Sequence, residues 1–129
     1  MENFVTLLKE QEDFLALNPA SESETAKAEQ ALDLKFAKEY VDYVQAFGAA
    51  TFGCHELTGI CTFSRLSVVD VTLKHRQMNP DVPLNLYVVE ECGMDDACIW
   101  QDEEGKVYCI VPGNAPQLVA SSLLTYYEK

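Results

Sequence analysis

The sequence predicts a mixed α+β fold, in which helices flank a central antiparallel sheet. Three observations favour it. Apolar residues recur at helical spacing in the first part of the chain, and strand-like runs separated by turn residues follow Pro83. The third is size, because 129 residues, 48% of them apolar, can bury about two thirds of their unfolded surface. Since the chain shows no internal repeat or linker, one domain is expected over residues 1–129.

Two helices are expected at the start of the chain. Residues 2–17 carry an amphipathic pattern, which Gln11 interrupts and Asn18-Pro19 ends, because the residue before a proline is pushed out of the helical region. Ser21 and Glu24 fit the S-x-x-E capping box, so a second helix should begin there and run to about Leu32.

A third helix is expected over residues 37–47, with Gly48 as the residue that ends it. The glycines spaced along segment 49–63 predict a loop with one or two short strands, near Cys54–Leu57 and Ile60–Phe63. Ser67 is the expected N-cap of a fourth helix over residues 68–78.

The last part of the chain predicts an antiparallel meander followed by a helix. Its strands are Leu84–Glu90, Ala97–Gln101 and Lys106–Val111, and Gly105 supplies a positive φ in the turn that begins at Asp102. The final helix should cover about Ser121–Glu128, with an earlier start at Pro116 as the alternative, and Leu118, Leu123 and Tyr126 are expected to pack on the sheet.

The charge is strongly acidic: nine Lys and Arg face 21 Asp and Glu, a formal net charge of −12. This charge argues against nucleic acid and anionic membranes as partners, because both attract Lys and Arg, and it permits a basic protein partner. The N-terminus lacks the basic start of a signal peptide, and no run approaches the roughly 18 apolar residues of a membrane span. A cytoplasmic protein is therefore expected.

The acids are unevenly placed. The segment from Glu90 to Glu104 holds seven acids and no base, and it spans two predicted turns and the strand between them. The acids are Glu90, Glu91, Asp95, Asp96, Asp102, Glu103 and Glu104. Two interpretations stay open: a solvated surface that protects a sheet edge, or an electrostatic patch that steers a basic protein partner.

Catalytic and metal-binding patterns are weak. The five cysteines are odd in number and scattered, which indicates reduced thiols. Cys54-His55 would point to opposite faces of a strand, and whether another cysteine meets a histidine in space is not visible in the sequence. The Cys54–Cys61 and Cys92–Cys98 spacings do not match a zinc knuckle, and no phosphate-binding loop is present. No catalytic residue, metal or cofactor is expected.

Several motifs together resemble a known family. They are Glu29-x-x-Leu32-Asp33-Leu34, Tyr40-x-x-Tyr43-Val44, Phe47-Gly48 with Gly59, Thr72-x-x-x-Arg76, Asp102-x-x-Gly105-x-Val107-Tyr108 and Ser121-Ser122-Leu123-x-x-Tyr126. In this order, over about residues 22–128, the chain resembles the SUKH superfamily of fungal cell-wall-assembly regulators and bacterial toxin-immunity proteins. It departs from the family pattern at Phe36-Ala37, where Leu-Pro is usual, and at Gly48-Ala49-Ala50, where a double glycine is usual.

The resemblance implies a sheet flanked by helices and a non-enzymatic, protein-binding role. In bacteria this role is usually immunity, in which the protein binds and neutralises a toxin of the nuclease or deaminase type, and such toxins tend to be basic. We expect the contact at the acidic segment Glu90–Glu104, with Trp100 and Tyr108 as candidate hot-spot aromatics and core packing as the alternative for Trp100. The chain should be a monomer or a weak dimer. The rival functions are a small Cys/His- or metal-dependent enzyme and a regulatory scaffold.

Overall fold

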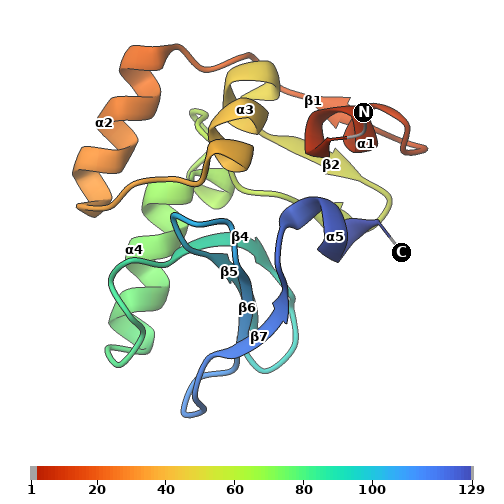
Figure 1. Ribbon diagram of the computed structural model, residues 1–129. Coiled ribbons are helices and arrows are strands. Elements are labelled where there is room, and N and C mark those ends of the chain that lie inside the picture. The colour runs from red at the N-terminus through yellow and green to blue at the C-terminus, as the bar shows by residue number, and fades with distance from the viewer. Residues whose placement is uncertain (1–2, 129) are drawn as a thin grey trace.

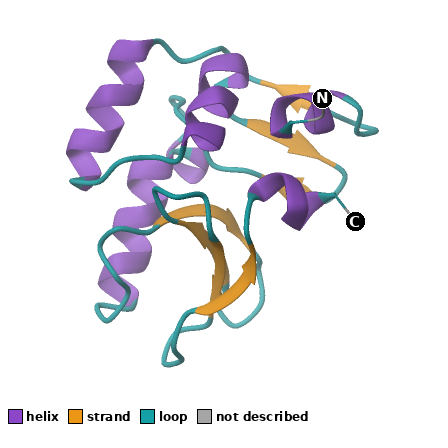
Figure 2. Ribbon diagram, in the orientation of Figure 1, coloured by secondary structure: helices purple, strands orange, loops and turns teal. Residues whose placement is uncertain are grey.

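Helices and antiparallel sheets alternate along the chain in the computed structural model, which describes residues 3–128 (Figures 1 and 2). The mixed α+β class is therefore confirmed. The helices of the described residues are α1 (Phe4–Lys9), α2 (Glu22–Leu32), α3 (Lys38–Phe47), α4 (Val68–Met78), α5 (Leu123–Tyr127) and a short 3-10 helix, η1 (Ser64–Leu66). No helix in this part of the chain is long and apolar enough to cross a membrane.

The strands form two sheets rather than one. The smaller has the order β1-β2-β3, with β1 at Leu15–Ala16, β2 at Ala50–Phe52 and β3 at His55–Glu56. The larger is an antiparallel meander of β4 (Tyr87–Glu91), β5 (Cys98–Gln101), β6 (Val107–Ile110) and β7 (Gln117–Ala120). An isolated bridge between Leu57 and Glu90 joins the two sheets.

The first two strands of the larger sheet, β4 and β5, are buried on both faces. On β4, Tyr87 and Val89 belong to the main core with the helices α1, α3 and α5, whereas Val88 belongs to a second cluster with Val71 of α4. Because side chains of a strand alternate between its two faces, successive residues of β4 lie in different layers. The strand begins at Tyr87 rather than at Leu84, whose side chain is 68% exposed.

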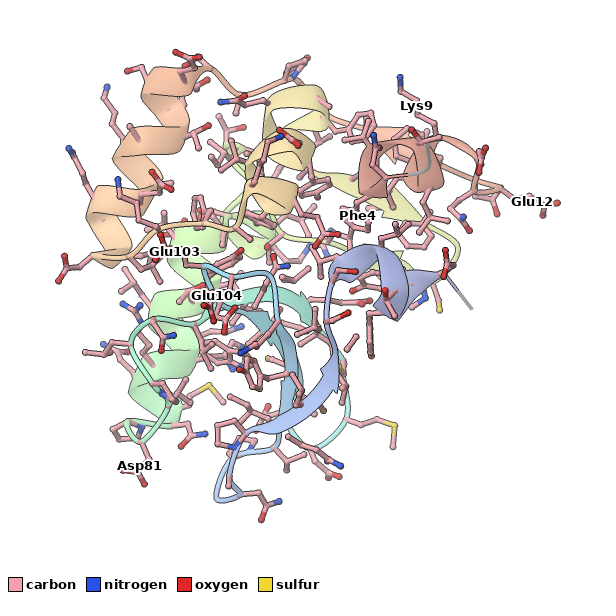
Figure 3. All side chains as sticks on the ribbon, viewed as in Figure 1. Phe4, Lys9, Glu12, Asp81, Glu103 and Glu104 are labelled. Atoms are coloured by element: carbon pink, nitrogen blue, oxygen red, sulfur yellow. The ribbon has the colours of Figure 1, made fainter. Side chains whose placement is uncertain are left out.

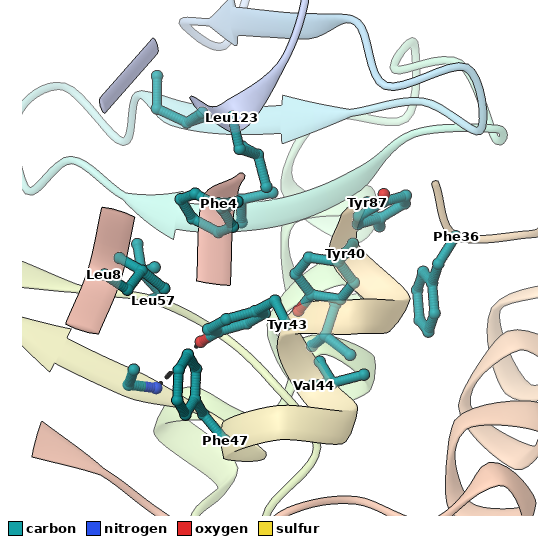
Figure 4. Close-up of a cluster of buried hydrophobic side chains, with 14 of the residues drawn as sticks. Phe4, Leu8, Phe36, Tyr40, Tyr43, Val44, Phe47, Leu57, Tyr87 and Leu123 are labelled. Atoms are coloured by element: carbon teal, nitrogen blue, oxygen red, sulfur yellow. Dashed lines mark hydrogen bonds between the residues drawn. The ribbon is translucent and has the colours of Figure 1, made fainter. Parts of the chain in front are cut away.

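The main core is rich in aromatic residues whose hydroxyl groups are hydrogen-bonded (Figure 4). The Tyr40 hydroxyl lies 2.8 Å from Thr58 Oγ1, which itself donates to the carbonyl of Val88. The Tyr43 hydroxyl donates to the Thr58 carbonyl and accepts from the Ala50 amide. Because a buried hydroxyl without a partner costs free energy, these bonds allow tyrosine where phenylalanine would be the simpler choice.

The helices with clear capping signals form where they are predicted. The Ser21 side chain accepts a hydrogen bond from the Glu24 amide at 3.0 Å, and the Glu24 carboxylate accepts one from the Ser21 amide at 2.9 Å. The capping box is therefore complete. Ser67 caps α4 as predicted. At the end of α3, Gly48 has φ +73°, and a Cβ there would lie 2.0 Å from the carbonyl oxygen of Asn18.

The first predicted helix is too long. Helix α1 ends at Lys9, Asp13 adopts φ 61°, and the chain then enters β1 with the Leu15 side chain 69% exposed. Phe14 packs on Phe47 at a ring distance of 4.9 Å, so it contributes to the core from a loop. The helix ends just before Gln11, where the apolar stripe is interrupted; the predicted start at Glu2 lies outside the described residues.

Two other predictions are wrong. The predicted strand near Cys54–Leu57 is confirmed by β3, and β2 precedes it, but residues 60–63 contain bends and not a strand. The final helix lies within the predicted Ser121–Glu128, and Leu123 is buried in the main core as predicted. The alternative start at Pro116 is wrong, because residues 117–120 form β7, which leaves Leu118 59% exposed. Helix α5 begins only after Ser122, whose side chain accepts from the Thr125 amide.

Candidate functional site

The fold divides the acidic segment between the two ends of the larger sheet. Asp95 and Asp96 lie in the β4–β5 loop, whereas Glu103 and Glu104 lie in the β5–β6 turn, and all four residues are exposed. Strand β5 has four residues, so the two acidic groups are separated by about 13 Å along the sheet. The exposed acids therefore form two groups, one at each end of the sheet.

Other members of the segment are buried and hold the fold. Glu90 is 8% exposed; it accepts from the Tyr127 hydroxyl at 2.6 Å and lies 2.9 Å from His55 Nδ1. Trp100 is 2% exposed and packs in the cluster beneath α4, which corrects its suggested role as a partner contact. These side chains are not accessible to a partner in this fold.

Asp102 organises the β5–β6 turn from inside. It is 7% exposed, and its Oδ1 accepts from the backbone amides of Glu104 and Lys106 at 3.0 and 2.9 Å. The hydroxyl of the half-buried Tyr108 donates to Oδ2 at 3.3 Å. With Gly105 at φ 98°, this acid shapes the turn on which its two exposed neighbours stand.

Glu91 is half-buried and ion-paired. Its carboxylate lies 2.7 Å from Lys74 Nζ and 2.6 Å from His75 Nε2. Burial acts to raise the pKa of Glu91, but the hydrogen bonds and charges of Lys74 and His75 outweigh it and hold that pKa below its usual value. This carboxylate is therefore occupied by partners from α4.

The exposed acids of the β5–β6 turn adjoin acids from α3. Gln101 Nε2 donates both to Glu39 Oε1 at 2.9 Å and to the carbonyl of Gly105 at 3.0 Å, which ties the turn to the first turn of α3. In Figure 3, Glu103 and Glu104 project at this end of the sheet. We define the acidic end as Glu39, Asp42, Glu103 and Glu104.

A groove of about 550 Å³ opens beside the acidic end, between α1, α3 and α5. Its lining is mainly apolar, from Phe4, Val5 and Leu124, and Glu39 and Asp42 lie on its α3 side with Lys38. The two lysines of this region pair with local acids, Lys38 with Asp42 and Lys106 with Glu104, on exposed side chains where such pairs are weak. Acids thus outnumber bases around an apolar groove.

A thiol, an imidazole and a carboxylate come together elsewhere, at the junction of α4, β4 and β5. Cys98 Sγ lies 3.4 Å from His75 Nε2 and 3.6 Å from Nδ1, and the same Nε2 is engaged by Glu91. Burial, with the charge of Glu91, raises the pKa of Cys98 to about 12, and the residue is 1% exposed. A protonated, inaccessible thiol is a packing group and a poor nucleophile.

The remaining thiols and acids are dispersed. Within residues 3–128 all five cysteines are free, and no group of three or more His, Cys, Asp or Glu side chains is placed to hold a metal ion. Sequence reasoning found the acids of the β5–β6 turn. It missed Glu39 and Asp42, because nothing local in α3 indicates that its first turns meet a hairpin more than 60 residues further on.

The fold and the site define an acidic α+β domain with one end that combines an apolar groove and exposed carboxylates. Residues 1–128 match a family model, SUKH_5, described as SMI1-KNR4 cell-wall, and the chain therefore belongs to this SUKH family. No curated protein matches the chain significantly.

The motif residues that carried the resemblance have structural roles. Thr72 Oγ1 accepts from the Val88 amide, and Arg76 Nη2 donates to the carbonyls of Leu32 and Leu84, so α4 is fixed to α2 and to the segment before β4. Ala37, where a family proline is usual, donates its amide to the Tyr87 hydroxyl at 3.0 Å, a bond that proline could not make.

Proposed function

We propose that this chain is a non-enzymatic protein-binding domain of the immunity type, which binds and neutralises a basic toxin domain of the nuclease or deaminase class. The observation that carries the proposal is the acidic end: Asp42, Glu103 and Glu104 expose carboxylates beside an apolar groove. Membership of the SUKH family supports a protein-binding role.

The two parts of this surface suit different parts of an interface. Exposed carboxylates on a chain of charge −12 attract a basic partner over a distance and speed its association. The apolar floor from Phe4, Val5 and Leu124 offers a pocket for an anchoring side chain, since binding energy concentrates where apolar groups are fully desolvated. We expect a partner with an apolar anchor flanked by Lys or Arg.

A charge reversal tests this proposal. The double variant Glu103→Lys, Glu104→Lys should slow association with the cognate toxin domain, and weaken the dependence of the rate on salt. Asp102 is kept, because it shapes the turn. The matched control is Glu10→Lys, Glu12→Lys, two exposed acids after α1 that change the net charge equally. Equal association rates for both doubles would contradict docking at the acidic end.

A regulatory scaffold is the second candidate, because the matching family is described by a cell-wall function. It would use the same surface for a different partner. Loss of toxin neutralisation in cells that carry the double variant, with unchanged growth in the absence of toxin, supports immunity; a growth defect without any toxin supports the scaffold.

A further inference from the structure

Strand β7 forms an open edge of the larger sheet. It pairs with β6 on one side, and no strand of the described residues covers its other side (Figure 2). Its side chains are mostly exposed, with Leu118 at 59% and Val119 at 40%. An edge of this kind presents unpaired backbone N–H and C=O groups, and proteins protect such edges with charged residues, short strands, proline or bulges.

No charged residue of β7 protects this edge. The segment from Val107 to Tyr127 contains no Asp, Glu, Lys or Arg and is the longest uncharged run in the chain. It includes β7, the loop before it and the residues that lead into α5. A basic partner gains little from a surface without carboxylates, so this edge does not suit the partner proposed for the acidic end.

A second copy of the chain suits it better. Two molecules that each carry −12 repel one another through most of their surfaces. In a two-fold contact, residues near the axis lie beside their own copies, where like charges are unfavourable. An uncharged strand avoids that cost. We propose that β7 is the contact strand of a weak two-fold dimer, in which two β7 strands pair antiparallel and join two four-stranded sheets into one.

The contact is small. Val107 pairs with Ala120 and Tyr108 with Leu118, so Val119 is an extra residue that forms a bulge and shortens the regular edge. Stable dimers usually bury more than about 1,200 Å² in total, which a strand of this length does not reach alone. The dimer should therefore appear only at high protein concentration.

Sedimentation velocity over a concentration series tests the proposal. The mass of the wild-type protein should rise toward that of a dimer as concentration increases. Leu118→Glu places like charges near the two-fold axis and should weaken association at least tenfold. The control is Leu84→Glu, an equally large exposed leucine outside the sheet at 68% exposure, which adds the same charge. A wild-type protein that stays monomeric throughout, or equal weakening by both variants, would overturn the proposal.

Two further measurements use the wild-type protein alone, so they do not depend on whether a variant folds. Amides of β7 in the wild type should exchange hydrogen more slowly at high than at low concentration, while those of the β4–β5 loop stay unchanged. Added salt should strengthen the dimer, because it screens repulsion between two acidic chains, whereas it should weaken binding of a basic toxin. This opposite salt response keeps the failure of one proposal separate from that of the other. Concentration-independent exchange in β7 would contradict the dimer.

Discussion

The carboxylate of Glu39 accepts a hydrogen bond from the backbone amide of Leu123 at 2.8 Å, although the two residues are 84 positions apart. Its second oxygen accepts from the Leu124 amide at 3.0 Å. An acid of α3 therefore caps the start of α5, and the same carboxylate binds Gln101. One side chain thus fixes the mutual placement of the helices that border the groove.

Replacement of this acid should loosen the groove. Glu39→Gln keeps the size of the side chain but removes the charge and one acceptor, and bonds to a charged acceptor contribute about 2 kcal/mol. We expect a loss of about that size in the free energy of unfolding, measured by urea denaturation, together with faster hydrogen exchange at Leu123 and Leu124. Glu12→Gln, at an exposed site, should change neither quantity. Unaltered exchange in α5 would show that its start is held by other contacts.

The glycine after α3 should not tolerate a side chain. Gly48→Ala combines a positive φ with a Cβ 2.0 Å from the carbonyl oxygen of Asn18, so the backbone must move, at a cost of about 3 kcal/mol or more. Gly53→Ala is the control, because Gly53 also has a positive φ, at +55°, but faces open space. It should cost about 1 kcal/mol. Comparable thermal stability of the two variants would mean that the close approach to Asn18 relaxes easily.

Thiol reactivity should separate a packing role for Cys98 from a catalytic one. Because Cys98 is buried and the pKa of its thiol is raised to about 12, alkylation by iodoacetamide at neutral pH should be far slower at Cys98 than at the exposed Cys54. Mass spectrometry of peptides from the native protein measures both rates, and the unfolded protein serves as the control in which they converge. Rapid labelling of Cys98 in the native protein would instead support the hypothesis of a cysteine-dependent enzyme.

Stability should fall in alkaline solution. Burial raises the pKa of Tyr40, Tyr43, Tyr87 and Tyr127 above the ordinary value of about 10. Above that pH the unfolded chain releases protons that the folded chain retains, so the free energy of unfolding decreases as pH rises. Tyrosinate absorbance should therefore increase in one steep step that coincides with unfolding followed by circular dichroism. Gradual ionisation of most tyrosines in a folded protein would contradict this.

Much of the fold followed from patterns that span a few residues. The capping box of Ser21 and Glu24, the cap at Ser67 and the glycine turn after Asp102 each predicted an element that the structure contains. These signals are local because a helix end or a tight turn satisfies its own backbone groups within one turn of chain. Strand β7 was missed because its pairing with β6 is decided by a neighbour in space and not by its own residues.

In the acidic segment, too, some features could be predicted from the sequence and others depended on the tertiary structure. Its charge could be counted from the sequence, and the exposure of Glu103 and Glu104 agrees with the predicted turn. The sequence could not show which acids face solvent. Glu90 is held inside by Tyr127 and His55, and Asp102 by backbone amides, and only folding brings these partners close.

Net charge, capped helices and family motifs were therefore readable in the chain itself, since each depends on composition or on neighbours in sequence. The groove, the contact between Glu39 of α3 and the β5–β6 turn, and the burial of Glu90 and Asp102 depend on tertiary packing. Tertiary packing alone decided them, because burial of apolar side chains on both faces of the sheet determines which polar groups must be satisfied inside and which remain in water.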